Sequence, residues 1–434
     1  MLKAPRLSPL TFHLSPKMTT VYLKPHKEES LLRFHPWVFS GAIRSIQLDA
    51  DYPHAQPQEG EVVQVLDSNG KILGVGHYQI GSIAVRILAF GVGELPADFW
   101  QERIRAAYEV RHSLGLISPI SDNRYPITDN QRPLNNTYRL IHGEGDFLPG
   151  LIVDIYADTA VIQAHSIGMH CHRQEIAEAI AQVVPQVDKV YYKSDDTLPH
   201  KAPIQGERVG YLIGAEKADF NGDFWAKENG LDFRIDWLRG QKTGFFIDQR
   251  DNRSLLEHYA KDKEVLNMFC YTGGFSVYAL RGGAKLVHSV DVSQKAIDLV
   301  RSNVAHNFGE NVPHQAFAEE AFEFMAKNQN KYDLIILDPP AFAKHRDAVK
   351  NALRGYQRLN AKGIQAIRPG GILFTFSCSQ AIDKDMFRLA VFSAAAQVGR
   401  KVRILHQLHQ PADHPINIYH PEGEYLKGLV LQVE

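Results

Sequence analysis

Residues 264–280 read EVLNMFCYTGGFSVYAL, and this stretch decides the fold of the C-terminal half of the chain. The apolar run at 264–269 predicts a strand, Gly273 and Gly274 predict a tight turn, and the apolar residues that follow predict a helix. Glycines at such a turn let the backbone approach a ligand closely, and the N-terminus of the next helix favours an anionic group. The spacing is not that of a G-x-G-x-x-G dinucleotide motif, because no third glycine follows. The stretch therefore indicates a ligand-binding turn without identifying the ligand.

Strands and helices alternate on the C-terminal side of this turn. Further strands are predicted at 286–292, 332–338 and 370–377, and helical patterns begin near 275, 294, 319, 346 and 381. Continuous apolar strands separated by helices indicate a parallel sheet that is covered on both faces. The last two apolar runs, at 401–409 and 424–433, have no helix between them and predict an antiparallel pair at the sheet edge. The predicted fold is an α/β, Rossmann-like domain with a mixed sheet, and its antiparallel edge hairpin is typical of class I methyltransferases.

The N-terminal half has a different pattern. Residues 18–95 are rich in β-branched runs around a hairpin signal, SNG at 68–70, and predict a small β-barrel. Helix and strand signals from about residue 97 to about residue 200 predict a small α+β unit. We divide the chain into a tail at 1–18 that is expected to be disordered, a β-barrel domain at 19–95, an α+β middle domain at 96–204 and the α/β domain at 205–434.

The composition limits the function. A chain of 434 residues with 44% hydrophobic and 22% charged residues is long enough for several ordinary folded domains. No run approaches the roughly 18 apolar residues of a membrane span, so no membrane partner is expected. A net charge of −1 excludes a uniformly basic nucleic-acid-binding protein. The three cysteines are too far apart for a disulfide framework or a zinc site, and the C-terminal histidines lack metal-ligand spacing, so we expect a cytoplasmic protein without a metal.

Acidic residues and one cysteine follow the predicted strands at the edge where ligands bind in such sheets. Asp291 ends the second strand, and a carboxylate there can accept both ribose hydroxyls of NAD or of S-adenosylmethionine. Asp338 is followed by two prolines that fix the backbone, so its carboxylate could bind the edge of a base; a rigid turn with Asp338 as a helix cap is the alternative. Cys378 ends a further strand between two serines.

A thiol at this edge has a specific chemical use. Carbon 5 of a pyrimidine is a weak nucleophile, but addition of a thiolate to carbon 6 turns it into an enamine carbon that can attack a sulfonium methyl group. A free cysteine has a pKa near ~8.5, so the site must stabilise the thiolate or the adduct, and the base must leave its stack. A buried core cysteine is the ordinary alternative; we expect it for Cys171 and Cys270, whereas Cys378 lies at the ligand edge.

The motifs together resemble the bacterial and archaeal family of PUA-domain-containing large-subunit (23S) rRNA cytosine-C5 methyltransferases. The resemblance runs from about residue 19 to the end of the chain and rests on blocks in a fixed order. They are HPWVFSGAI at 35–43, GEGDFLPGLIVDIY at 143–156, GQKTGFFIDQRDNR at 240–253, NMFCYTGGFSVYAL at 267–280, LDPPAFAK at 337–344, SCS at 377–379 and HPEGEYLKGL at 420–429.

This resemblance implies an RNA-binding PUA domain at 19–95, S-adenosylmethionine as the cofactor, and large-subunit rRNA rather than DNA as the partner. It implies that Cys378 is the catalytic nucleophile and that Asp338 is the acidic residue beside the base. Ala341 stands where many RNA C5 methyltransferases have a second cysteine that assists product release, which leaves that step without an assigned group. The oligomeric state stays open, with a homodimer as one option.

The resemblance also implies a cofactor pocket and an RNA-binding edge. The pocket residues are Phe269, Tyr271, Thr272, Gly273, Gly274, Asp291, Glu320, Asp338, Gln249 and Arg250. Glu320 replaces the usual aspartate, and Gln249 with Arg250 could instead belong to a structural salt-bridge cluster with Asp248 and Asp251. Arg33, His35, Trp37 and Arg44 would face RNA in the PUA domain, and a solvated charged face is the alternative for them.

Two other functions remain open from the sequence. A guanine or adenine N-methyltransferase of the same fold could use the Asp-Pro-Pro segment, but its chemistry needs no thiol. A catalytically inactive RNA-binding assembly factor would bind RNA tightly without methyl transfer. The complete set of the glycine turn, Asp291, Asp338 and Cys378 favours an enzyme.

Overall fold

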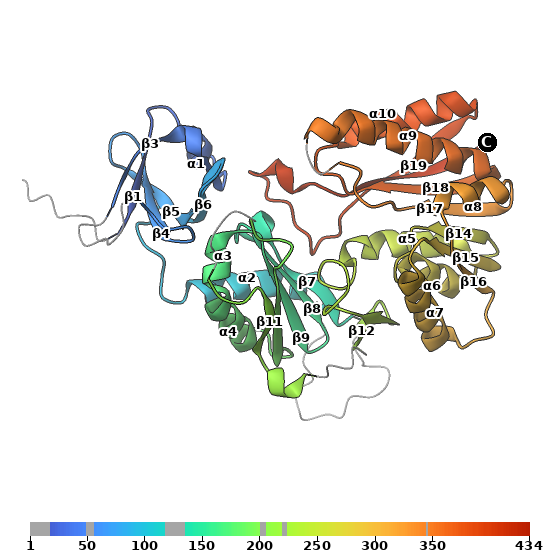
Figure 1. Ribbon diagram of the computed structural model, residues 1–434, viewed down its shortest axis with the longest axis horizontal. Coiled ribbons are helices and arrows are strands. Elements are labelled where there is room, and N and C mark those ends of the chain that lie inside the picture. The colour runs from blue at the N-terminus through green and yellow to red at the C-terminus, as the bar shows by residue number, and fades with distance from the viewer. Residues whose placement is uncertain (1–17, 49–55, 118–134, 200–204, 219–223, 344–345) are drawn as a thin grey trace, which may run out of the picture. The chain divides into compact units, whose positions relative to one another are not determined.

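The computed structural model of the protein describes residues 18–434 except 49–55, 118–134, 200–204, 219–223 and 344–345 (Figure 1). The tail predicted at 1–18 lies outside the described residues apart from Met18. The chain forms two compact units. The first comprises residues 1–99, 164–173 and 198–205, and the second comprises 100–163, 174–197 and 206–434.

The first unit is built on a six-stranded sheet. Its elements are β1 (Thr20–Leu23), α1 (Glu29–Leu32), β2 (Trp37–Phe39), β3 (Ile43–Gln47), β4 (Val62–Leu66), β5 (Ile72–Tyr78) and β6 (Ile83–Phe90), with α3 (Ile167–Cys171). The strand order is β2-β6-β5-β4-β1-β3, and only β1 and β4 run parallel. The predicted hairpin is confirmed between β4 and β5, where Asp67 Oδ1 accepts the N–H groups of Asn69 and Lys71 at 2.8 Å each.

The second unit begins with a five-stranded sheet in the order β11-β10-β9-β8-β7. Its strands are β7 (Thr137–His142), β8 (Leu151–Tyr156), β9 (Thr159–Ala164), β10 (Lys189–Lys193) and β11 (Val209–Ile213), and its helices are α2 (Phe99–Ser113) and α4 (Arg173–Val183). Strand β11 follows the boundary predicted at residue 204 and pairs with β10, so this sheet extends beyond that boundary. A separate hairpin of β12 (Phe224–Glu228) and β13 (Leu231–Ile235) leads onward.

The last part of the chain forms a seven-stranded mixed sheet. Its strands are β14 (Glu264–Met268), β15 (Leu286–Asp291), β16 (His314–Ala318), β17 (Tyr332–Leu337), β18 (Ile367–Ser377), β19 (Val402–His409) and β20 (Lys427–Val433). They are ordered β16-β15-β14-β17-β18-β20-β19; β14 to β18 are parallel, and β20 is antiparallel to both neighbours. The predicted Rossmann-like sheet with an antiparallel edge is therefore confirmed. Strand β16 was not among the runs predicted above, because this edge strand contains His314 and Gln315 and has no fully buried residue.

Helices cover both faces of this sheet. Helices α5 (Arg250–Ala260), α6 (Gly274–Arg281) and α7 (Gln294–Phe308) cover one face, and α8 (Ala321–Lys327), α9 (Val349–Ala366) and α10 (Lys384–Val398) cover the other (Figure 1). Leu256 and Phe275 pack with Phe374 in the first layer, while Leu359 and Phe387 pack in the second. Successive strand residues alternate between these two cores, which is why the strands read as unbroken apolar runs.

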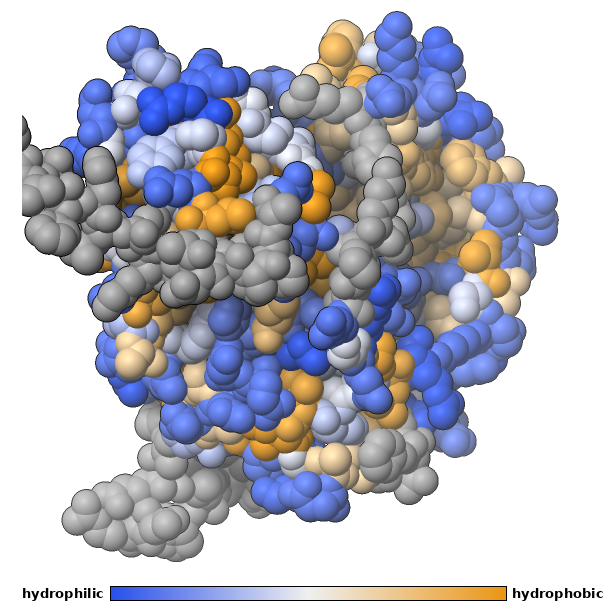
Figure 2. All heavy atoms as spheres, turned by 60° about the vertical axis from the view of Figure 1, so that its left-hand side comes forward, coloured by the Kyte–Doolittle hydropathy of each residue, from blue (hydrophilic) through white to orange (hydrophobic). Residues whose placement is uncertain are grey.

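The surface in Figure 2 is mostly hydrophilic, with hydrophobic residues in small groups between charged ones. Scattered apolar side chains on a surface are ordinary, because no protein has enough polar groups to cover itself. Within the described residues, no helix has the length and apolar character needed to cross a bilayer.

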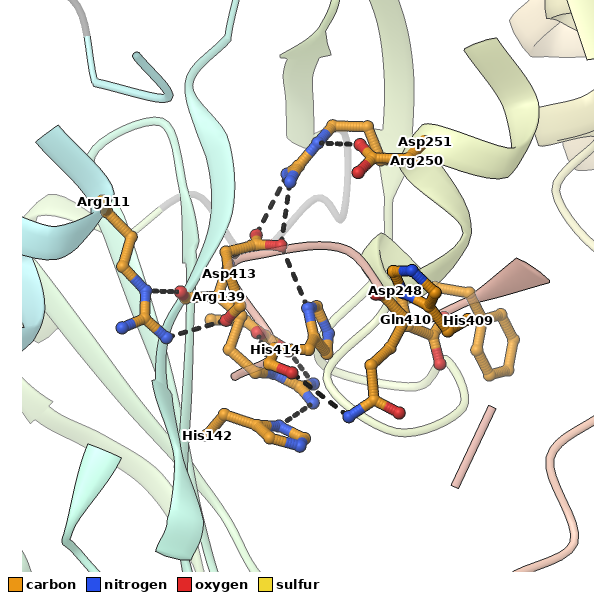
Figure 3. Close-up of polar contacts among 12 residues, drawn as sticks. Arg111, Arg139, His142, Asp248, Arg250, Asp251, His409, Gln410, Asp413 and His414 are labelled. Carbon is orange, nitrogen blue, oxygen red and sulfur yellow. Dashed lines mark hydrogen bonds and ion pairs between the residues drawn. The ribbon is translucent and has the colours of Figure 1, made fainter. Parts of the chain in front are cut away.

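A buried polar network joins the five-stranded sheet to the loop between β19 and β20 (Figure 3). Arg250, the first residue of α5, donates two hydrogen bonds to the carboxylate of Asp413, at 2.8 and 3.0 Å, and both side chains are nearly inaccessible. The same carboxylate accepts the Arg139 N–H at 3.0 Å, and Arg111 donates to the Asp413 carbonyl at 2.7 Å. His414 lies 3.1 Å from the carboxylate. These contacts fix the path of the chain toward β20.

We expect Asp413→Ala to lower the free energy of unfolding by about 3–5 kcal/mol, because it leaves the buried Arg250 guanidinium without its counter-ion. Urea denaturation at neutral pH measures the change. Asp251→Asn is the matched control: its carboxylate is 62% exposed, lies 3.5 Å from the same arginine, and should change stability by less than about 0.5 kcal/mol. Equal, small effects of the two variants would show that the buried pair does not stabilise the fold.

Candidate active site

The glycine loop after β14 has a constrained backbone. Phe269, Tyr271 and Gly273 have φ values of +57°, +46° and +79°. Non-glycine residues hold such values only where the surrounding structure imposes them, and they cluster at ligand sites. Asn303 on α7 contributes one such constraint by donating from Nδ2 to the Thr272 carbonyl at 2.8 Å. The loop is thus preset in one conformation at the N-terminus of α6.

The two glycines of the loop are required by close packing. A Cβ atom on Gly273 would lie 2.9 Å from Val300 Cγ1, and one on Gly274 would lie 3.0 Å from Arg253 Cδ. Helices α7 and α5 therefore approach the loop from two sides and leave no room for side chains there.

Asp291 lies at the end of β15, beside this loop. Its Oδ2 accepts the Tyr271 N–H at 3.1 Å, and its Oδ1 accepts the Ser293 N–H at 2.9 Å. A carboxylate oxygen has more than one lone pair, so both oxygens keep acceptor capacity for a ligand hydroxyl. The position is the one that the sequence predicts for a ribose-binding carboxylate.

Glu320 has a different setting. It is exposed and caps the short helix α8, where its Oε2 accepts the N–H groups of Phe322 at 2.7 Å and Glu323 at 3.0 Å. The structure thus shows a capping role, and the cofactor contact of Glu320 stays a prediction.

Gln249 and Arg250 are adjacent in sequence but contact different parts of the structure. Gln249 Nε2 donates to Asp338 Oδ2 at 3.0 Å, and its Oε1 accepts from Asn252 at 2.7 Å, so this amide belongs to the edge of the sheet where Asp338 lies. Arg250 faces Asp413 instead. The salt-bridge alternative therefore describes Arg250: it pairs with the expected Asp251 at 3.5 Å, but its main partner is Asp413 and not Asp248.

Asp338 directly follows β17 and has an unusual acidity. Burial raises the pKa of its carboxyl group to about 7, the charge of Asp248 raises it as well, and the hydrogen bond from Gln249 opposes the change. Near neutral pH the group can therefore be a carboxylic acid. A carboxylic acid donates one hydrogen bond and accepts another, so it can pair with a ligand edge that carries an acceptor beside a donor.

Cys378 directly follows β18 and is tied to the same edge. Its neighbours Ser377 and Ser379 are fully buried. Ser379 Oγ accepts the Ala343 N–H at 3.2 Å and lies 2.9 Å from Tyr356 Oη. This one hydroxyl joins the segment after Asp338 to the segment that carries Cys378.

The electrostatic surroundings disfavour a free thiolate. The pKa of Cys378 is raised to about 12, mainly by burial; the charges of Asp338 and Asp248 act in the same direction, and Lys242 acts in the opposite direction. A thiolate here needs additional positive charge or immediate bonding to a substrate.

Lys427, at the start of β20, is a buried cation beside the thiol. Its Nζ donates to the carbonyls of Ser379 at 2.7 Å and Ile382 at 2.5 Å. Burial lowers its pKa to about 8, and the Cys378 thiol favours the charged form. The ammonium group therefore holds the segment that follows Cys378 and interacts electrostatically with its sulfur.

The other cysteines differ from each other. Cys270 is buried in the glycine loop, as expected. The expectation of a buried Cys171 is wrong: it is the last residue of the short helix α3, and it is exposed although the four residues before it are buried. Cys378 itself is partly buried and packs on a core layer that includes Phe376 and Leu426.

The four residues proposed for RNA binding have different settings in the PUA-like sheet. His35 and Trp37 lie together, with ring centroids 5.9 Å apart and the Trp37 N–H donating to His35 Nδ1 at 3.2 Å. Arg33 is 79% exposed and pairs with Glu29 at 3.4 Å. Arg44 lies on β3, where its guanidinium is 5.5 Å from the ring centre of Tyr22.

Several residues of this edge were not singled out by the sequence. Asp248 lies in η5 (Ile247–Gln249), and its Oδ2 accepts from Tyr425 Oη at 2.7 Å. Tyr425 and Lys427 come from the block EYLKGL, and Asp413 precedes it. Two of the quoted blocks contain Asp248, Tyr425 and Lys427, but only the folded chain shows that they meet beside Asp338 and Cys378.

Comparison with known families assigns both parts of the chain. Residues 218–423 match the family of S-adenosylmethionine-dependent methyltransferases, and residues 21–90 match a PUA-like domain. Two curated relatives have the name ribosomal RNA large subunit methyltransferase I. The protein of Tolumonas auensis is 38% identical over 419 residues, covering 95% of this chain and 99% of the relative, and that of Alteromonas mediterranea is 39% identical over 418 residues, covering 95% and 98%.

Solved structures show the same fold. A SAM-dependent methyltransferase from Streptococcus mutans has a TM-score of 0.75 at 22% identity. The alignment covers 95% of this chain and 100% of the S. mutans chain. A methyltransferase crystallised with SAH has a TM-score of 0.77 at 22% identity, with the same coverage. The glycine loop and Asp291 lie at the edge of the sheet where the sequence predicts that S-adenosylmethionine binds.

We expect Gly273→Ala to weaken binding of S-adenosylmethionine at least about tenfold, because the new Cβ meets Val300 at 2.9 Å and moves the loop. Isothermal titration calorimetry measures the dissociation constant. Gly399→Ala is the control: its φ of +75° and ψ of +22° match those of Gly273, +79° and +22°, but nothing lies within 4 Å of the new Cβ. Equal binding by wild type and Gly273→Ala would show that the loop geometry does not determine affinity.

We expect Asp338→Asn to lower the apparent pKa of Cys378 by about one unit or more, because it removes a negative charge beside the thiol. The rate of alkylation by iodoacetamide is followed against pH by peptide mass spectrometry in a Cys171→Ser background, which removes the exposed thiol. Asp333→Asn, at the opposite end of β17, should leave the profile unchanged. An unchanged profile in Asp338→Asn would place its carboxylate away from the sulfur.

Proposed function

Because the chain belongs to the ribosomal RNA large subunit methyltransferase I family, we propose that it forms 5-methylcytosine in 23S rRNA through a covalent adduct of Cys378. Family membership supports the coarser activity, S-adenosylmethionine-dependent methylation of large-subunit rRNA. We propose the cytoplasm as its location, since rRNA in a bacterial cell is made there.

The observation that carries the choice of cytosine C5 is the link through Ser379 between the Asp338 and Cys378 segments. A thiol at this edge has no use in methylation of an exocyclic amine, whose nitrogen is already nucleophilic. It is necessary for carbon 5, which becomes nucleophilic only after addition at carbon 6. The presence of Cys378 therefore favours C5 chemistry over N-methylation.

The residues at this edge of the sheet have separate roles in the proposed reaction. The Asp338 carboxylic acid donates its proton toward N3 and accepts from the amino group, which orients the base and withdraws electrons from carbon 6. Cys378 Sγ then bonds to carbon 6, and Lys427 offsets part of the charge on the sulfur. Bound S-adenosylmethionine would supply the electrophilic methyl group, and the glycine loop and Asp291 would hold it at the same edge.

The RNA-binding role of the PUA-like domain is part of the proposal. His35 and Trp37 form a small aromatic group in which a base could stack, and Arg33 presents an exposed guanidinium near them in sequence. Arg44 lies on a different strand and would contact the backbone of RNA instead.

We expect 23S rRNA fragments that contain 5-fluorocytosine to form a denaturant-stable adduct with the protein when S-adenosylmethionine is present. Fluorine at carbon 5 cannot leave as a proton, so the reaction stops at the adduct. Cys378→Ser should abolish both this adduct and the formation of 5-methylcytosine in normal RNA, as measured by gel electrophoresis and nucleoside mass spectrometry. Cys171→Ser should behave as wild type. Methylation of RNA by Cys378→Ser, or a methylated purine as product, would contradict the proposal.

A further inference from the structure

Product release in the proposed reaction requires a base, and the following inference rests on that proposed function. After methyl transfer, carbon 5 holds both the new methyl group and its original hydrogen, and carbon 6 is bonded to Cys378 Sγ. The hydrogen must leave as a proton before the sulfur can leave. Ala341, in the segment after Asp338, has no side-chain group that could accept it.

Two neighbouring groups are unsuited to this step. Asp338 is occupied at the edge of the base and accepts a hydrogen bond from Gln249 at 3.0 Å. Lys427 donates hydrogen bonds to two carbonyls, Ser379 and Ile382, so its nitrogen is held as a donor. An ammonium group has no lone pair with which to take a proton.

Asp248 has the features of the missing base. Its Oδ2 is fixed by the Tyr425 hydroxyl at 2.7 Å, while its Oδ1 is buried and has no hydrogen-bond partner among the described residues. Burying a carboxylate oxygen without a hydrogen-bond partner costs free energy on folding, and such groups recur at functional sites. The fixed oxygen orients the side chain, and the other oxygen is left available.

The position of Asp248 follows from contacts on both of its sides. The next residue, Gln249, bonds to Asp338. Its partner Tyr425 lies two residues before Lys427, which pairs in the sheet with Ser377, the neighbour of Cys378. The charge of Asp248 raises the pKa values of both Asp338 and Cys378, as expected for a carboxylate that faces both groups.

We propose that Asp248 is the general base that removes the proton from carbon 5 and so releases methylated RNA. The cycle starts from the Cys378 thiolate, whose proton has gone to solvent. Sγ bonds to carbon 6 while the Asp338 proton moves to N3, and carbon 5 then takes the methyl group. Asp248 Oδ1 removes the carbon 5 proton, the electrons of the C–H bond form the carbon 5–carbon 6 double bond, and the carbon 6–sulfur bond breaks to return the thiolate. N3 returns its proton to Asp338, and Asp248 loses its proton to water.

Tyr425 is a positioning residue in this scheme. Burial and the nearby Asp248 charge keep the pKa of its phenol well above the ordinary value, so it stays a donor throughout the reaction. Its hydrogen bond engages Oδ2 and leaves Oδ1 as the oxygen available to take the proton.

The test is the Asp248→Asn variant with ordinary cytosine-containing 23S rRNA fragments and cofactor labelled in its methyl group. An amide cannot take the proton, so we expect a denaturant-stable protein–RNA adduct that contains the labelled methyl, and product release slowed by about 10²–10⁴-fold. Wild type should release product without a lasting adduct. Cofactor binding and thermal melting confirm that the variant is folded, and Asp298→Asn, an exposed carboxylate on α7, is the matched control.

The outcomes separate this inference from the proposed function. If wild type forms the 5-fluorocytosine adduct but Asp248→Asn releases product at the wild-type rate, Asp248 is not the base and the C5 chemistry stands. If wild type forms no 5-fluorocytosine adduct, the proposed function fails. If folded Asp248→Asn forms no adduct even with 5-fluorocytosine RNA, Asp248 acts before addition, and the base role is wrong.

A second variant keeps the test usable if Asp248→Asn does not fold. Tyr425→Phe removes only the hydrogen bond that orients the carboxylate. We expect it to accumulate the methylated adduct partially and to slow release about tenfold, with a smaller effect on adduct formation. Release at the wild-type rate would overturn the inference.

Discussion

The buried pair of Arg250 and Asp413 determines where the end of the chain can go. Asp413 lies between β19 and β20, and its carboxylate is bound at once by α5 and by the backbone of β7. Arg111 from α2 binds the carbonyl of the same residue. A long loop is thereby held in the interior by charge-assisted hydrogen bonds, because a buried carboxylate without partners would cost several kcal/mol. Such a pair fixes the path of the loop more than it adds to the net free energy of unfolding.

This geometry also determines the surroundings of the sheet edge where Asp338 and Cys378 lie. The loop that Asp413 fixes continues into Tyr425 and Lys427, which contact Asp248 and the Ser379 segment. Arg250 itself begins the helix that follows Asp248 and Gln249. The Arg250–Asp413 ion pair thus positions two sets of residues near Asp338 and Cys378. One set is Tyr425 and Lys427, and the other is Asp248 and Gln249. The glycine loop and Asp291 are independent of this ion pair, since they are built by β14, β15 and the helices packed on them.

The sequence predicts what depends on local patterns. Unbroken apolar runs identify the central strands, and the turn at Gly273, Asp291, Asp338 and Cys378 follow because strand ends in a parallel sheet share an edge. Strand β16 was not predicted because an edge strand is only half covered and therefore lacks an unbroken apolar pattern. The partner of Arg250 could not be predicted, since Asp413 lies 163 positions away and no periodicity links them. Asp248 was visible only as one charge in a charged block, and its free oxygen appears only when Tyr425 is in place.

The charges of the edge also suit the order of the reaction. The charges of Asp338 and Asp248 raise the pKa of the Cys378 thiol, and bound S-adenosylmethionine would bring a sulfonium cation that opposes this effect. In the proposed reaction a cation near the sulfur would lower the pKa of the Cys378 thiol, whereas without the cofactor the thiol stays protonated. In the proposed reaction, methyl transfer would remove that positive charge. Asp338 and Asp248 would then again disfavour the thiolate, so the sulfur that leaves carbon 6 would return to its protonated resting form.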